Sequence, residues 1–258
     1  MFTIERQQNI INELKKEKSI TVAKLSKKFF IGEATIRRDL EKLEKAGFLK
    51  RTYGGAVLLD GLDMEIPLTV RETENREEKS IIAQLAGKFV GNGDIIIIDS
   101  SSTTLKIVPC LKNKENLTVI TNSAKASLEL GEQHHARVYC TGGMLRENSQ
   151  SFIGQQARSF IESYSADILF FSCRGLSMER GLTDSNEEEV ELRRIMIKNS
   201  KESILLCDHT KFDQVSFCKI GNFDCINTII TDRMPSQCWI QFLEEKGVKL
   251  VYTKSWYH

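Results

Sequence analysis

Apolar positions repeat with two different periods along this chain of 258 residues. In the first 58 residues they recur every three or four positions, which predicts three helices, at residues 3–17, about 21–29 and about 33–46. From residue 94 onward, short and almost wholly apolar runs alternate with further helical patterns, which is typical of strands covered on both faces. The pattern predicts an α/β protein in which a small helical unit precedes a larger domain with a mostly parallel sheet.

The small unit has the pattern of a winged helix-turn-helix. Thr21 is the predicted N-cap of the second helix, Phe30-Ile31-Gly32 forms a tight connection, and Gly47 is predicted to end the third helix. Two short alternating runs then flank Gly54-Gly55, which is a strong hairpin signal. Residues 1–58 are therefore predicted to form a winged helix-turn-helix domain in which this hairpin is the wing.

The third helix is expected to enter the major groove of double-stranded operator DNA, where Arg suits guanine and any Lys or Arg neutralises a phosphate. Residues 1–58 carry 13 Lys and Arg against 7 Asp and Glu, whereas residues 59–258 carry 23 against 28. The basic charge is thus concentrated in the small unit. The alternative is a protein-interaction module with a solvated basic face. The expected DNA-contacting residues are Thr21, Glu33, Ala34, Thr35, Arg37, Arg38, Lys42, Arg51, Tyr53, Gly54 and Gly55.

Residues 59–74 mix acidic, Gly and Pro residues without a strong period and are predicted to be a linker. Residues 75–258 are predicted to be an effector-binding α/β domain. It begins with a helix over about 75–90, on which residues 76–79 are expected to face solvent. Seven strands are predicted near residues 94–99, 117–121, 137–141, 167–173, 203–208, 225–231 and 248–252.

Hydroxyl, amide and glycine residues follow several of these strands, where ligands of parallel sheets bind. A hydroxyl-rich turn that leads into a helix suits a phosphate, and Gly-Gly lets the backbone approach a ligand. Ser, Thr and Asn are also ordinary helix caps, which is the alternative for each turn taken alone. The expected effector-binding residues are Asp99, Ser100, Ser101, Ser102, Thr103, Thr104, Thr121, Asn122, Gly142, Gly143, Arg174 and Lys211.

The residues 6–58, with the core ATIRRDLEKLEKAGFLKRTYGGAVL, resemble the DeoR family of bacterial transcriptional regulators through T-I-R-R-D-L at 35–40 and G-G-A at 54–56. The segments DSSSTT (99–104), TNS (121–123), TGG (141–143), GLTDS (181–185) and DHTKF (208–212) resemble its C-terminal effector domain. The resemblance implies a sugar-phosphate isomerase fold without the enzyme activity. It also implies that the hydroxyl loop holds a phosphate, that 121–122 and 142–143 line a sugar, and that Lys211 assists.

Other features of the sequence exclude several classes of protein. The apolar runs are much shorter than the ~18 residues that span a bilayer, and the charged N-terminus has no signal-peptide core. The seven cysteines form no C-x-x-C pair, which favours reduced thiols over a disulfide framework or a zinc site. We therefore expect a cytoplasmic protein with no membrane partner, no metal site and no cofactor.

The expected function is a DNA-binding transcriptional regulator, a repressor of a sugar-metabolism operon whose operator affinity responds to a phosphorylated sugar. A homodimer or homotetramer would match a pseudo-palindromic operator. One alternative is a phosphosugar isomerase-like enzyme with an accessory DNA-binding head, whose general base would be Asp184, Glu187 or Glu188. The other is a structural DNA-binding or scaffold protein whose polar strand ends only cap helices.

Overall fold

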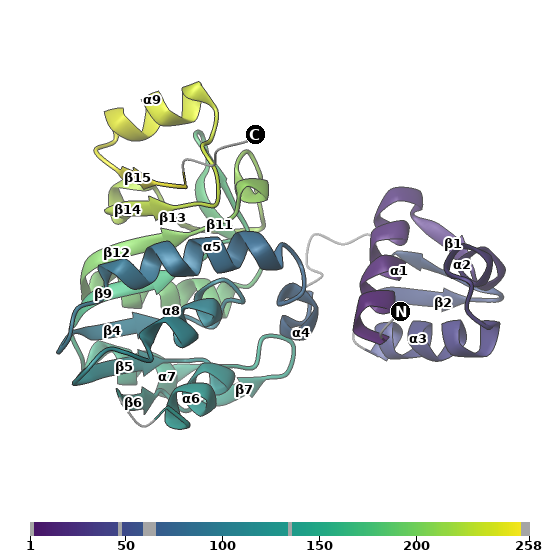
Figure 1. The fold of residues 1–258 in the computed structure, drawn as a ribbon, viewed down its shortest axis with the longest axis horizontal. Coiled ribbons are helices and arrows are strands. Elements are labelled where there is room, and N and C mark those ends of the chain that lie inside the picture. Colours follow the sequence, from purple (N-terminus) through teal and green to yellow (C-terminus); the bar gives the residue numbers. More distant parts are fainter. Residues whose placement is uncertain (1–2, 46–47, 59–65, 134–135, 254–258) are drawn as a thin grey trace. The chain divides into compact units, whose positions relative to one another are not determined.

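The structure of the chain is a computed structural model that describes residues 3–45, 48–58, 66–133 and 136–253. Its internal contacts divide it into two compact units, with the division between Thr73 and Glu74 (Figure 1). The first, which ends at Thr73, is called the N-terminal unit, and the second, which begins at Glu74, is called the sensor unit. The predicted helix end at 46–47 and residues 59–65 of the predicted linker lie outside the described residues.

The N-terminal unit contains the three predicted helices and the predicted wing. The helices are α1 (Thr3–Glu17), α2 (Val22–Phe29) and α3 (Glu33–Lys45), and the wing strands are β2 (Leu49–Thr52) and β3 (Gly55–Leu58). A third strand, β1 (Ser19–Thr21), pairs antiparallel with β3 and was not predicted, because three residues carry no readable alternation. The apolar faces of the helices meet in one core that includes Ile11, Leu25 and Leu40.

The segment read as a linker is not structureless throughout. Residues 68–71 form a short helix, α4 (Leu68–Arg71), in which Leu68 and Val70 are buried. Hydrogen bonds from the backbone of Glu72 to Leu68 and from Thr73 to Val70 continue the turn. Two apolar residues two positions apart are too weak a signal to predict such a helix from sequence.

All seven predicted strands of the sensor unit are present, in one seven-stranded sheet. Every neighbouring pair in it is parallel, in the order β15-β14-β12-β9-β4-β5-β6. The strands are β4 (Ile95–Ile98), β5 (Leu117–Thr121), β6 (Ala136–Cys140), β9 (Ala166–Phe171), β12 (Ser200–Leu206), β14 (Thr228–Ile230) and β15 (Lys249–Val251). The predicted fold class is thereby confirmed.

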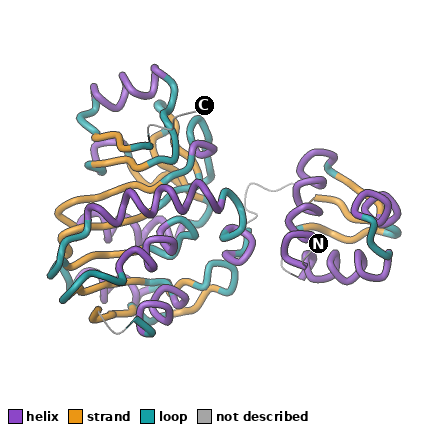
Figure 2. Tube along the Cα trace, in the orientation of Figure 1, coloured by secondary structure: helices purple, strands orange, loops and turns teal. Residues whose placement is uncertain are grey.

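Helices cover both faces of this sheet (Figure 2). One face packs against α5 (Arg76–Ala86), the 3₁₀ helix η2 (Thr104–Leu111) and α6 (Ala124–Gly131). The other packs against α7 (Gln155–Glu162), α8 (Glu187–Lys198) and α9 (Gln237–Glu245). A 3₁₀ turn, η1 (Gly87–Phe89), continues α5. The expectation that residues 76–79 all face solvent was wrong for Lys79, which is 4% exposed and donates a hydrogen bond from Nζ to the Glu74 carbonyl.

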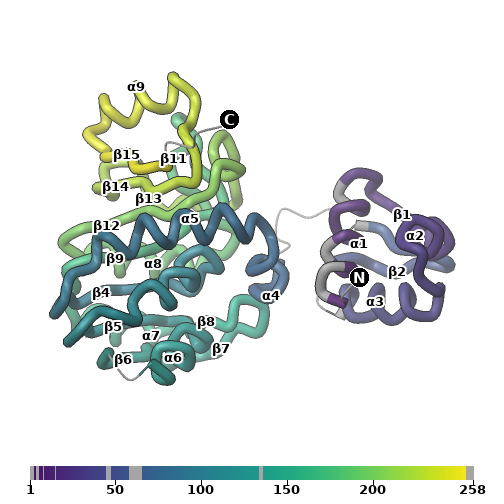
Figure 3. Tube along the Cα trace, viewed as in Figure 1, coloured from purple at the N-terminus to yellow at the C-terminus, as the bar shows by residue number. Residues whose placement is uncertain are grey.

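Several short elements of the sensor unit were not predicted. They are the hairpin of β7 (Met144–Arg146) and β8 (Ser151–Ile153), the antiparallel sheet of β10 (Gly175–Ser177), β11 (Gly181–Asp184) and β13 (Cys218–Gly221), and the 3₁₀ turns η3 (His209–Lys211) and η4 (Phe223–Cys225). The tube in Figure 3 follows these excursions between the main strands. All seven cysteines are free thiols. Within the described ranges, none of the helices is long and apolar enough to cross a membrane.

Candidate functional site

Helix α3 presents its basic side chains to solvent. Arg37, Arg38 and Lys42 are exposed, while Ile36 and Leu40 of the same helix are buried in the core of the N-terminal unit. Arg37 forms an ion pair with Glu33 at 3.0 Å in which both side chains are about half exposed. An exposed pair of this kind contributes little to stability, so the guanidinium can exchange its partner for a phosphate or a base edge.

The wing is fastened to α3 through Arg51. Its backbone N–H donates to Glu44 Oε1 at 2.8 Å and its Nε to Glu44 Oε2 at 2.6 Å. Both hydrogen bonds lower the pKa of Glu44, and the one from the Arg51 backbone has the larger effect. Tyr53, at the tip of the wing, is fully exposed beside Gly54, whose φ of +91° needs glycine. Arg37 and Arg51 together line a cavity of about 250 Å³ between helix and wing.

Two of the expected DNA-contacting residues have structural roles that explain their residue types. A Cβ on Gly55 would lie 2.4 Å from the Ile20 carbonyl oxygen, so glycine is needed for β3 to pair with β1. Thr21 caps α2 by accepting a hydrogen bond from the Lys24 amide at 3.2 Å. Of the others on α3, Glu33 and Ala34 are exposed and Thr35 is half-buried.

Asp39, within the T-I-R-R-D-L stretch, is a residue that the sequence reasoning left without a role. It is 2% exposed and forms an ion pair with Arg6 of α1, whose Nη2 lies 3.2 Å from Asp39 Oδ1. The hydrogen bond with Asp39 raises the pKa of Arg6. A buried charge among the polar positions of an amphipathic helix looks like a surface residue in sequence, so only the placement of α1 identifies it.

In the sensor unit, the order of the strands places the loop of residues 100–104, here the hydroxyl loop, at a reversal of the sheet. From β4 the chain moves outward through β5 and β6, and then returns to the other side of β4 with β9. Ligands of parallel sheets bind outside the carboxyl ends of the strands at such a reversal. The topology therefore supports the expectation that this loop belongs to a binding site.

Asp99 organises the hydroxyl loop from below. Its Oδ1 accepts hydrogen bonds from the Ser101 amide at 3.0 Å and the Thr104 hydroxyl at 2.7 Å, and its Oδ2 accepts from the Ser172 amide at 3.2 Å. Arg193 Nε also donates to Oδ2, at 2.8 Å. Asp99 and Thr104 thus use their polar atoms within the protein, and we assign them to holding the loop instead of touching an effector.

The side chains of the hydroxyl loop are more covered than its sequence suggested. Residues 100–104 are each at most 6% exposed, because Asp99 draws Ser101 and Thr104 inward. No described residue accepts a hydrogen bond from the backbone N–H groups of Ser102 and Thr103. Two adjacent amides for which the described residues supply no acceptor, next to two hydroxyls, are hydrogen-bond donors of the kind that bind anions.

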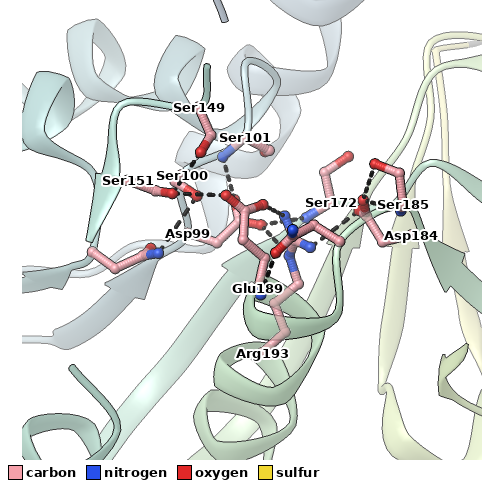
Figure 4. A network of polar contacts seen from close by, with 12 residues as sticks. Asp99, Ser100, Ser101, Ser149, Ser151, Ser172, Asp184, Ser185, Glu189 and Arg193 are labelled. Carbon is pink, nitrogen blue, oxygen red and sulfur yellow. Dashed lines mark hydrogen bonds and ion pairs between the residues drawn. The ribbon is translucent and has the colours of Figure 1, made fainter. Parts of the chain in front are cut away.

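Arg193 of α8 is the centre of the buried polar network in Figure 4. Besides Asp99, it donates from Nη1 to Asp184 Oδ2 at 3.0 Å and from Nη2 to Glu189 Oε2 at 3.4 Å, and it is only 4% exposed. Burial lowers the pKa of Arg193, but the carboxylates of Asp184, Asp99 and Glu189 outweigh it and hold that pKa above its ordinary value. The guanidinium joins β4, β11 and α8.

Glu189 extends the network to the hairpin of β7 and β8. Its Oε1 accepts hydrogen bonds from Arg146 Nη1 at 2.9 Å and from Ser151 Oγ at 2.7 Å, and Ser149 Oγ lies 2.7 Å from Ser151 Oγ. In the sequence, Glu189 was indistinguishable from its two acidic neighbours at the start of α8. The structure separates it from them, since Glu189 is 4% exposed.

The ends of β5 and β6 carry the next expected residues. Thr121 Oγ1 accepts from the Ser123 amide at 3.0 Å, and Ser123 caps α6. Asn122 is buried, and no residue in the described ranges donates a hydrogen bond to its Oδ1. After β6, Gly142 has a φ of +63° and Gly143 a φ of +109°, and a Cβ on Gly143 would lie 2.5 Å from the Ile153 carbonyl oxygen.

The turn after β12 brings Asp208 and Lys211 to the same edge of the sheet. Asp208 is fully buried, and its Oδ1 accepts hydrogen bonds from Thr210, while none of the described residues donates to its Oδ2. Burial raises the pKa of Asp208, but the charges of Lys211 and Lys79 and the Thr210 hydrogen bonds bring it below its ordinary value. Lys211 is half-buried, and no described carboxylate forms an ion pair with its Nζ. Arg174, after β9, is also half-buried.

Comparison with known proteins agrees with both units. Residues 6–61 match the model of the DeoR-like helix-turn-helix domain, and residues 74–233 match that of the DeoR C-terminal sensor domain. An uncharacterized HTH-type transcriptional regulator of Bacillus subtilis, YulB, is 41% identical over 250 residues, covering 97% of this chain and 96% of the relative. The HTH-type transcriptional regulator GolR of Listeria innocua is 37% identical over 96% of this chain and 98% of its own.

More distant proteins are similar as well. The HTH-type transcriptional repressor GlcR of Bacillus subtilis is 32% identical over 98% of both chains. Among solved structures, ribose 5-phosphate isomerase A of Methanocaldococcus jannaschii is 18% identical with a TM-score of 0.40, and the match covers 54% of this chain and 55% of that one. The match therefore spans about half of each protein and carries no argument about activity.

Proposed function

Because the chain belongs to the DeoR family of transcriptional regulators, we propose that it represses a sugar-metabolism operon and loses affinity for its operator when a phosphorylated sugar binds to the sensor unit. The DNA half of the proposal rests on α3, whose exposed Arg37, Arg38 and Lys42 project from one side while the other is buried. In a helix-turn-helix this side enters the major groove.

The observation that carries the effector half is the set of unpaired polar groups along the carboxyl edge of the sheet. The amides of Ser102 and Thr103 and the Lys211 ammonium are donors suited to a phosphate. The Oδ1 of Asn122 and the Oδ2 of Asp208 are buried acceptors for which the described part of the chain supplies no donor. Since an unmet buried acceptor is costly, hydroxyl groups of a sugar are suitable partners for both.

Further parts of the proposal follow from the family and the site. A homodimer or homotetramer in the cytoplasm would place two recognition helices about 34–36 Å apart on a pseudo-palindromic operator. We also propose that the protein does not catalyse a reaction. Asp184, one of the bases that an isomerase would need, is instead held by Arg193 and by the Ser185 amide at 2.7 Å.

The DNA half is tested by selecting duplexes from a random pool with the whole protein and measuring their affinity by fluorescence anisotropy. Arg37→Ala or Arg38→Ala should weaken binding by about 5- to 150-fold, as expected for loss of a base contact worth roughly 1–3 kcal/mol. Lys88→Ala removes one exposed positive charge from the sensor unit and should change little. If no duplex is enriched, or if all three variants bind alike, the DNA half is wrong.

The effector half is tested by thermal unfolding with glycerol 3-phosphate, ribose 5-phosphate, glucose 6-phosphate and fructose 6-phosphate. A compound at about 100 times its Kd should add about 2.7 kcal/mol of stability, which is a rise in Tm of about 5 °C or more for a unit of this size. Lys211→Met should reduce that rise. No shift with any of the four compounds at millimolar concentration would contradict the effector half.

A further inference from the structure

The sensor unit begins with a contact between its first residues and the turn that carries Lys211. Asn75 Nδ2 lies 3.2 Å from Asp208 Oδ1 and 3.4 Å from Thr210 Oγ1, which are 133 and 135 positions away in sequence. Asn75 precedes α5 directly and adopts the left-handed conformation, with φ 49° and ψ 43°. We propose that Asn75 is the positioning residue through which occupancy of the effector site is transmitted to the segment that leads to the DNA-binding unit.

Asp208 depends on a small number of compensating groups. Its carboxylate is fully buried, and Lys211, Thr210 and Lys79 offset the cost of its charge. Lys79 lies one helical turn after Asn75, is itself buried, and donates to the Glu74 carbonyl at 2.7 Å. The start of α5 thus supplies Asp208 with a hydrogen bond from the Asn75 amide and with the positive charge of Lys79. Lys211 supplies a second positive charge from the proposed effector site.

An anion bound to Lys211 changes this balance. The ammonium then shares its field between the anion and Asp208, so the carboxylate relies more on Asn75 and Lys79. The contact at the start of α5 is strengthened, and by thermodynamic reciprocity the loss of that contact lowers the affinity for the anion by no more than about threefold. This inference rests on the proposed function, because it requires an anionic effector that acts on operator binding.

The segment before Asn75 is ordered enough to pass on a change. The short helix α4 ends at Arg71, and the backbone amides of Glu72 and Thr73 bond back to it. Arg71 Nε donates to the Ile66 carbonyl at 2.8 Å, and the Lys79 amide bonds to the Asn75 carbonyl at 3.0 Å. Only residues 73 and 74 lie between Glu72 and Asn75, so a change in the backbone angles of Asn75 acts directly on the end of α4.

The test compares Asn75→Gly with Asn116→Gly. Both asparagines have a left-handed backbone, with φ of 49° and 56°, and glycine keeps that conformation while removing the side chain. Asn116 lies before β5 and is exposed, so it is the matched control. Asn75→Asp is a second variant, since Asp tolerates the same backbone but places a like charge beside Asp208.

Each full-length protein is titrated onto a duplex selected by the wild type, with and without the four sugar phosphates named above. We expect the wild type and Asn116→Gly to lose at least about fivefold in DNA affinity with an active compound, and both Asn75 variants to lose less than about twofold. Direct calorimetric binding of that compound to the Asn75 variants should stay within about threefold of the wild type, because the phosphate donors are intact.

The outcomes separate the inference from the proposal on which it rests. If the wild type responds and the Asn75 variants respond equally, the inference is wrong and the proposed function stands. If the Asn75 variants lose calorimetric binding itself, Asn75 belongs to the binding site and the transmitting role is wrong. If the wild type responds to none of the compounds, the effector half of the proposed function is wrong, and the inference falls with it.

Discussion

Arg193 Nε lies 2.8 Å from Asp99 Oδ2, which connects helix α8 to the end of the central strand β4 across 94 positions of sequence. The same aspartate holds the hydroxyl loop through Ser101 and Thr104. The hydroxyl loop is therefore shaped by a guanidinium that is itself buried. The position of the loop depends both on this pair and on the hydrogen bonds that Ser101 and Thr104 make within the loop.

Replacing Arg193 should destabilise the sensor unit strongly. Arg193→Met leaves Asp99, Asp184 and Glu189 buried without their shared cation, which costs about 3–5 kcal/mol. Arg180→Met is the control, because Arg180 is exposed and should change stability by less than about 0.5 kcal/mol. Urea unfolding followed by circular dichroism measures both, and equal midpoints for the two variants would refute the role of Arg193.

Replacing Asp39 should lower the stability of the N-terminal unit, because this residue is buried in an ion pair and does not face the solvent side of α3. Asp39→Ala leaves Arg6 buried without its carboxylate and should cost about 3 kcal/mol. Glu17→Ala removes a surface pair with Lys24 on the same unit and should cost less than about 1 kcal/mol. The comparison is made by chemical unfolding, monitored by helical ellipticity. If Asp39→Ala leaves the free energy of unfolding unchanged, the stabilising role assigned to Asp39 is wrong.

Two glycines should respond in opposite directions to alanine. Gly143→Ala forces a positive φ on alanine and places its Cβ 2.5 Å from the Ile153 carbonyl oxygen, so a loss of about 2 kcal/mol or more is expected. Gly131→Ala lies at the end of α6, where no atom of the described residues is within 4 Å of the new Cβ, so a gain of about 0.5 kcal/mol is expected. The Tm values of the two variants report the signs, and a stable Gly143→Ala would contradict the packing described here.

The charge of Asp208 should produce a pH dependence in the acid range. Its pKa is lowered in the folded protein, so it stabilises the fold at pH values above its unfolded pKa of about 3.9, and this contribution is lost as the pH falls through the lower folded value. The difference in unfolding free energy between wild type and Asp208→Asn should be constant above about pH 5 and shrink below about pH 4. Urea titrations at several pH values measure it. A difference that grows on acidification would have the wrong sign.

The sequence predicted the elements whose patterns extend over enough residues. Helix α3 repeats its apolar positions at Ile36, Leu40 and Leu43, and the main strands are continuous apolar runs such as 95–98, so both were found. Strand β1 and the pair of β7 and β8 have three residues each, and their existence depends on partners elsewhere in the chain. Periodicity cannot identify such elements.

The sequence predicted which polar residues lie at one edge of the sheet but not which contacts each of them makes there. The polar residues after β4, β5 and β12 do lie at one edge of the parallel sheet, as their positions after apolar runs indicated. The sequence did not predict the buried charges. Lys79, Glu189 and Arg193 lie on helices, where charged side chains are usually exposed to solvent. Only the fold shows that Asp99 forms an ion pair with Arg193.

The most direct test of the account is the affinity of the whole protein for a selected duplex, measured by fluorescence anisotropy in the absence and presence of the four sugar phosphates. The account predicts that at least one compound weakens binding by about 5- to 150-fold, corresponding to a coupling of about 1–3 kcal/mol. It also predicts that Lys211→Met reduces this response while leaving DNA affinity without the compound unchanged. Tight binding to the duplex that no sugar phosphate alters would contradict it.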